Sequence, residues 1–144
     1  MENSFCAGWA GRLLEGLEDD CPREVRERVL ARCAQYHYEV NRMDEALAPF
    51  VGDLEGFLEF LARTYGWIIT VEEGGGRLLV DENKDHCVCP IAQALENRVS
   101  RELCGCSALY ARRMFSKVLG REVRVQVRRS FLRDGQSCIY EITY

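Results

Sequence analysis

The sequence predicts an α+β protein with a four-stranded antiparallel sheet in two hairpins and helices packed mainly on one face. Three observations support this prediction. Apolar residues recur at helical spacing through the first part of the chain, four later segments alternate with a period of two, and those segments come in pairs. A length of 144 residues suits one domain. We therefore expect a single domain over 1–144, with a helical part (1–65) and a sheet-containing part (66–144).

The helical part is predicted to contain two long helices followed by two shorter ones. The first spans 4–17, with apolar residues about one turn apart. The second runs from Pro22 to about Asn41, because proline suits the first helical position and the acidic pair before it suits the positive end of the helix dipole. Pro49 is expected to end a short helical piece. Asp53 then caps a helix whose inward-facing residues are Leu54, Phe57, Leu58 and Leu61.

The sheet-containing part is predicted to hold two hairpins with helices between them. The glycine run 74–76 joins the first pair of strands, and Asp134-Gly135 turns the chain between the second pair. Between the hairpins we expect helices over 90–100 and 107–119, the second closed by Gly120. The predicted strands are 67–71, 77–80, 123–128 and 138–143.

Charge and hydropathy argue against two classes of partner. Residues 1–73 carry seven arginines against fifteen acidic residues, and 74–144 carry twelve basic against eight acidic residues, for a net charge of −4. Because nucleic-acid binders are usually basic, we expect no nucleic-acid partner. No apolar run approaches the roughly 20 residues of a membrane span, and residues 1–11 lack the basic start of an export signal. We therefore expect no membrane partner and a cytoplasmic location, with a homo-oligomer left open.

The eight cysteines are the only concentrated chemical signal. In a reducing compartment such thiols are usually free or metal-bound. Two Cys-x-Cys pairs stand immediately before predicted helices, Cys87 with Cys89 and Cys104 with Cys106. Unpaired backbone N–H groups at a helix start stabilise a thiolate, so we expect lowered pKa values for these thiols.

A zinc-like metal site is the first hypothesis for these thiols. Tetrahedral zinc takes four thiolate or imidazole ligands, and Cys87, Cys89, Cys104 and Cys106 supply four if the two helix starts lie side by side. Further candidate ligands are Cys33, His37, His86 and Cys21. The spacing is not that of a zinc ribbon, and cysteine is often a buried hydrophobe, so buried structural thiols in an interaction protein are an alternative.

Cysteine-dependent hydrolysis is the other alternative. A nucleophilic cysteine needs a histidine base within hydrogen-bond reach. Cys104 with His37 is the candidate pair, because adjacent residues such as His86 and Cys87 point different ways. Arg112 and Arg113, on the helix that the second thiol pair precedes, are candidates for holding a carboxylate of a cofactor or substrate.

The stretch from His86 to Tyr144 resembles bacterial proteins related to the 2-amino-thiazoline-4-carboxylate hydrolase-like group and the 4-vinyl reductase-type ligand-binding domain. The matching features are Cys89-Pro90-Ile91, Leu103-Cys104 before a helix, and the segment from Ser130 to Ile142. The resemblance implies an α+β domain with a small-molecule pocket between sheet and helices. The expected function is thus a small-molecule or metal-binding domain, with a hydrolase of a small C–N or C–S substrate as an alternative.

Overall fold

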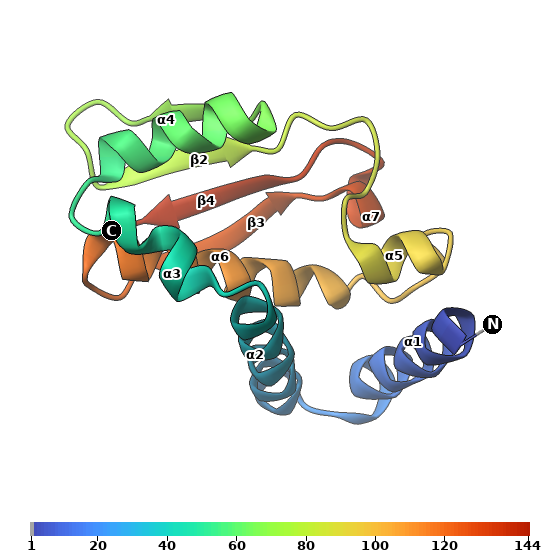
Figure 1. Cartoon of the computed structure of the whole chain (residues 1–144). Helices are drawn as coiled ribbons and strands as arrows, with labels where there is room; N and C mark the ends of the chain where they lie inside the picture. Colours follow the sequence, from blue (N-terminus) through green and yellow to red (C-terminus); the bar gives the residue numbers. More distant parts are fainter. Residues whose placement is uncertain (1) are drawn as a thin grey trace.

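The computed structural model describes residues 2–144, with side chains from Ser4 onward. Figure 1 shows one sheet in the upper part of the molecule, with α1 and α2 below it. The elements in chain order are α1 (Glu2–Asp20), α2 (Arg23–Val40), α3 (Met43–Leu47), the 3-10 helix η1 (Ala48–Phe50), α4 (Leu54–Tyr65), β1 (Ile68–Val71), β2 (Arg77–Asp81), α5 (Pro90–Ala94), α6 (Leu103–Leu119), β3 (Arg124–Arg129), α7 (Phe131–Asp134) and β4 (Ile139–Thr143).

The sheet confirms the predicted antiparallel architecture. Its strand order is β1-β2-β4-β3, so the two predicted hairpins meet through β2 and β4. Val80 is opposite Ile69 in β1 and Tyr140 in β4. Because side chains alternate between the faces of a strand, these three residues share one face.

A first hydrophobic cluster fills the helix-covered face of the sheet. Phe57 of α4 and Phe115 of α6 are fully buried there, with ring centroids 5.3 Å apart. Leu78 and Ile142, opposite each other in β2 and β4, complete its centre. The helices therefore cover one face, as predicted.

A second hydrophobic cluster joins the helices α1, α2, α5 and α6. Its buried members are Leu14, Leu30, Cys87, Ala92 and Leu103. Helix α2 approaches α6 closely at Gly105, where an added Cβ would lie 3.1 Å from Leu30 Cδ1. Helix α6 thus takes part in both clusters.

The outer face of the sheet carries a charged network around Glu141. This carboxylate accepts hydrogen bonds from Arg77 (2.9 Å) and Arg128 (2.8 Å) across the neighbouring strands. Desolvation by the covering side chains opposes ionisation, yet the two guanidinium groups hold the pKa of Glu141 below its usual value. This face is therefore polar, in contrast to the helix-covered face.

Several local predictions differ from the structure. Helix α6 starts at Leu103 rather than Ser107, and α5 ends at Ala94 rather than Ser100. A short helix, α7, replaces the expected turn because the side chain of Ser130 accepts a hydrogen bond from the backbone N–H of Arg133 and caps it.

Helix α1 also differs from expectation in the face it buries. Its predicted apolar stripe is exposed at Phe5, Trp9 and Leu13, whereas Ala7 and Leu14 are buried. In the described part of the chain, no helix combines the length and the apolar character that crossing a bilayer requires.

Replacing Phe57 by Ala should lower the free energy of unfolding by about 3–5 kcal/mol, because the first cluster would lose a fully buried aromatic ring and retain a cavity. Chemical denaturation followed by far-UV circular dichroism measures this change. Phe5→Ala, at a position that is 72% exposed, is the matched control and should change the value by less than about 0.5 kcal/mol. Equal effects of the two substitutions would contradict the assigned core.

Candidate functional site

A large cavity lies where the two hydrophobic clusters meet. Its volume is about 1030 Å³. Met114 and Tyr140 belong to the first cluster, Leu103 and Cys87 to the second, and all four line it. The walls come from α2, α6, the ends of β2 and β4, and the segment that leads from β2 into α5, and they are largely apolar.

Aromatic side chains form much of one wall. The rings of His37 on α2 and Tyr110 on α6 lie 4.7 Å apart, and Asn41 Nδ2 donates a hydrogen bond of 3.1 Å to Tyr110 Oη. The rings of Tyr65 and Trp67, at the end of α4, lie 5.6 Å apart. All five of these residues line the cavity.

Six of the eight cysteines line the same cavity. They are Cys33, Cys87, Cys89, Cys104, Cys106 and Cys138. Cys6 is exposed on α1, and neither it nor Cys21 is a lining residue. All eight are free thiols. The two Cys-x-Cys pairs were predicted to meet at one metal ion. The structure shows only that all four of these cysteines line the same cavity.

The predicted zinc-like centre is wrong. Across residues 2–144, no group of three or more Cys, His, Asp or Glu side chains is placed to hold a metal ion. The prediction assumed that both thiol pairs come immediately before helices. Cys104 and Cys106 instead lie inside the first turn of α6. Gly105, between these two cysteines, lies where Leu30 of α2 approaches α6 closely.

The additional metal candidates also have other surroundings. His86 is on the surface, where its Nδ1 lies 2.7 Å from a carboxylate oxygen of Asp85. The ring of His37 lies tilted against that of Tyr110, and Cys33 is exposed. Cys21 lies just before α2, away from the cavity walls.

The thiols are also not activated as nucleophiles. Burial raises the pKa of Cys87, of Cys104 and of Cys106, the last to about 11, and therefore outweighs any stabilisation by a helix start. Cys104 Sγ donates to Ser130 Oγ at 3.3 Å. Within the described residues no cysteine forms a hydrogen bond with His37, so the structure offers no cysteine–histidine pair for the predicted hydrolase alternative.

The two arginines proposed as carboxylate ligands lie outside the cavity walls. Arg112 forms an ion pair with Glu122. The guanidinium carbon of Arg113 lies 5.0 Å from the ring centroid of Tyr38. Both therefore have structural partners.

An acidic side chain in the cavity wall was not predicted. The backbone N–H of Glu82 donates to the carbonyl of Cys138 at 3.0 Å, which continues the β2–β4 ladder by one residue. Trp67 and Glu82 each lie one residue beyond the last β1–β2 pair, Ile68 with Asp81. Trp67, Glu82 and Cys138 all line the cavity.

Glu82 is strongly affected by this apolar environment. Desolvation raises its pKa to about 7, although Lys84 opposes the shift. The Nζ of Lys84 itself donates to the carbonyl of Tyr65 at 2.6 Å. A signal for this residue was present in the sequence, because Glu82 continues the inward-facing alternation of Leu78 and Val80.

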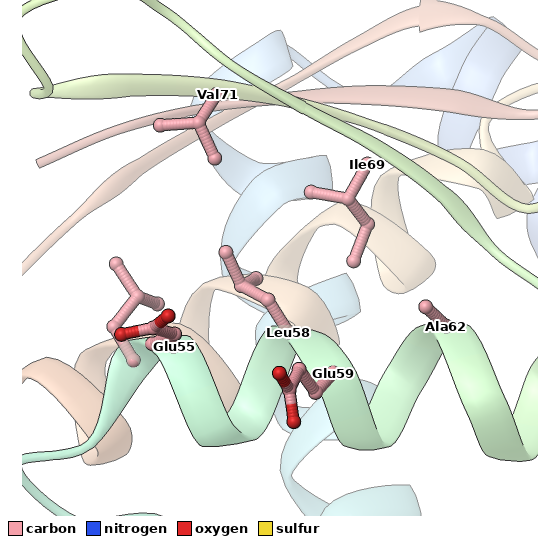
Figure 2. Close-up of a pocket in the computed structure, with 7 residues that line it drawn as sticks. Glu55, Leu58, Glu59, Ala62, Ile69 and Val71 are labelled. Carbon is pink, nitrogen blue, oxygen red and sulfur yellow. The ribbon is translucent and has the colours of Figure 1, made fainter.

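A second, smaller hollow lies between α4 and β1. Figure 2 shows Ile69 and Val71 pointing from the strand toward Leu58 on the helix, with Glu55 and Glu59 along that helix. Its volume is about 630 Å³. Both acidic residues are exposed or half-buried, and no thiol, histidine or aromatic side chain lines it. The chemically distinctive side chains thus belong to the larger cavity.

The raised thiol pKa values predict slow alkylation. At pH 7.5 a thiol with a pKa of about 11, such as Cys106, is thiolate in about one molecule in three thousand, whereas an unperturbed thiol with a pKa of about 8.5 is thiolate in about one in ten. Peptide mass spectrometry after timed N-ethylmaleimide treatment should find Cys106 and Cys138 modified at least about 100-fold more slowly than exposed Cys6. Fast modification of Cys106 would contradict its burial.

Replacing Glu82 by Gln should stabilise the protein at alkaline pH. The folded state binds the Glu82 proton more tightly than the unfolded chain, so the residue's contribution to stability is complete below pH 4.5 and falls as the pH rises to about 7. Above that pH, Glu82→Gln should raise the free energy of unfolding by up to about 3 kcal/mol. At pH 4 the two proteins should be similar. Urea unfolding at both pH values tests this, and an equal effect at both would contradict it.

Comparison with known proteins yields no relative. No protein-family model matches the sequence, and neither the curated proteins nor the solved structures contain a significant match to it. The resemblance to the hydrolase-like and 4-vinyl reductase-type groups therefore stays a prediction, and the functional argument depends on the cavity.

Proposed function

We propose that this protein is a small-molecule-binding domain that holds a largely apolar ligand in the cavity between α2, α6 and the sheet. The observation that carries the proposal is the cavity itself, with a volume of about 1030 Å³. Ligand sites in proteins usually measure about 300–1,000 Å³, with apolar and aromatic walls and a few polar groups. The walls here follow that pattern, with Glu82, Asn41 and Ser107 among the few polar side chains.

The cost of such a space supports a ligand-binding role. Protein interiors are normally packed as densely as organic crystals, and an unfilled cavity forfeits contacts along its walls. The fully buried residues Phe57, Phe115 and Val118 show that the first cluster is well packed beside the cavity. A ligand would supply the contacts that the walls lack.

Binding is favoured over catalysis by the state of four thiols in the cavity wall. Burial raises the pKa of each of the thiols at 87, 104, 106 and 138, which lowers the thiolate population at neutral pH. Such thiols behave as small apolar wall groups. The eight free cysteines suit a reducing compartment, and a cytoplasmic location forms part of this proposal.

The experiment uses the neutral dye N-phenyl-1-naphthylamine, whose fluorescence rises in an apolar site. Dye titration should give saturable binding, and Ala111→Trp, which fills the cavity wall, should weaken it at least about tenfold. Ala62→Trp, in the hollow of Figure 2, is the matched control and should leave the dye affinity unchanged. Loss of binding in the control alone would place the dye in the other hollow and contradict the proposal.

A second readout needs no substitution. Bound dye should slow N-ethylmaleimide modification of Cys89 and Cys104, which line the cavity, and leave Cys6 unaffected. If saturating dye left the modification rate of each of these three cysteines unchanged, the proposal would be overturned, even if Ala111→Trp failed to fold.

A further inference from the structure

Glu82 is an acidic group in a largely apolar cavity. In the part of the chain that the structure describes, no lysine, arginine or histidine forms an ion pair with its carboxylate. The nearest basic influence is Lys84, whose Nζ is held by the Tyr65 carbonyl. A carboxylate taken out of water without a cation is unfavourable, so a positive charge delivered to it would be bound favourably.

Aromatic rings line the same cavity as this carboxylate. Trp67 comes one residue before Ile68, the β1 residue that pairs with Asp81, and the ring of Tyr65 lies 5.6 Å from that of Trp67. The face of an aromatic ring attracts cations, most strongly for tryptophan, and the attraction is larger away from water. The carboxylate and the indole therefore favour the same sign of charge.

The other charged groups on the cavity wall do not oppose the binding of a cation inside the cavity. Among the described residues that line the cavity, the acidic and basic side chains are those of Glu82, Arg32 and His37. Arg32 is exposed on α2, whereas Glu82 is half-buried by surface area and strongly desolvated. Because water screens the exposed guanidinium, Glu82 dominates the electrostatics inside the cavity.

We infer that the ligand is a lipophilic cation, an organic amine or onium compound, whose apolar body fills the cavity and whose charge lies against Glu82 and Trp67. This inference rests on the proposed function and adds the ligand class to it. The carboxylate supplies the counter-charge and the indole a cation–π contact. The aromatic and thiol-lined walls contact the apolar body.

The test compares two ions of nearly the same shape and opposite charge, tetraphenylphosphonium and tetraphenylborate. Isothermal titration calorimetry at pH 8 should give an affinity at least about tenfold higher for the cation. Glu82→Gln should remove this preference, and Trp67→Leu should reduce cation affinity several-fold. Glu59→Gln, in the hollow of Figure 2, removes the same negative charge from the protein and should leave both affinities unchanged.

The pH dependence of cation binding gives an independent measure. As the ionised fraction of Glu82 rises through its pKa of about 7, cation affinity should increase about tenfold between pH 6 and pH 8. The other titratable groups that influence or neighbour this carboxylate are Asp81, Lys84, Cys87, Cys138 and Tyr140. Burial raises the pKa of the two thiols and of the tyrosine, so these three stay neutral in this range. Glu82→Gln should abolish the dependence.

The outcomes separate this inference from the proposed function. If the neutral dye binds and Ala111→Trp weakens it, but the cation binds no better than the anion or is unaffected by Glu82→Gln, the cation inference is overturned and the binding cavity stands. Tighter binding of the anion, lost on Arg32→Gln, would also overturn it. If neither dye nor ion binds to the folded protein, the proposed function fails as well.

Discussion

The position of the cavity depends on helix α6, which packs into both hydrophobic clusters. Its Phe115 and Val118 bury against α4 and the sheet, whereas Leu103, near its start, buries against the cluster that α1, α2 and α5 share. The cavity lies at that junction, beside Met114 and Cys104.

This junction explains why the cysteines gather without forming a reactive centre. Cysteine is small and apolar when protonated, so it suits a wall that must leave space. Burial raises the pKa of Cys104 and of Cys106 although both lie in the first turn of α6, and desolvation is the largest cause of each shift. The same desolvation acts on Glu82, where it produces a carboxyl group that titrates near neutrality.

Desolvation of Glu82 makes its ionised form unfavourable in the folded protein, and it also produces a carboxyl group that titrates near neutrality. A carboxylate with a pKa of about 7 is a frequent sign of a functional position, because burial without a partner is otherwise unfavourable. The contrast with Glu141 is instructive. That residue lies between two arginines on the outer face, its pKa is lowered, and its role in the sheet is structural. Two acids near the same strands therefore differ because Glu141 accepts hydrogen bonds from two arginines, whereas desolvation is the largest influence on Glu82.

The sequence alone determined the strands and their inward faces, since the alternation of Leu78 with Val80 and of Tyr140 with Ile142 depends only on local periodicity. It also located most helices and the thiols that share the cavity. It did not determine which residues on different helices meet, so the metal site predicted from Cys87, Cys89, Cys104 and Cys106 was wrong. That outcome depends on where α6 begins and on the approach of α2 at Gly105. The contact of Glu82 with Cys138 likewise required strand pairing between distant segments, because long-range register is set by tertiary packing rather than by local pattern.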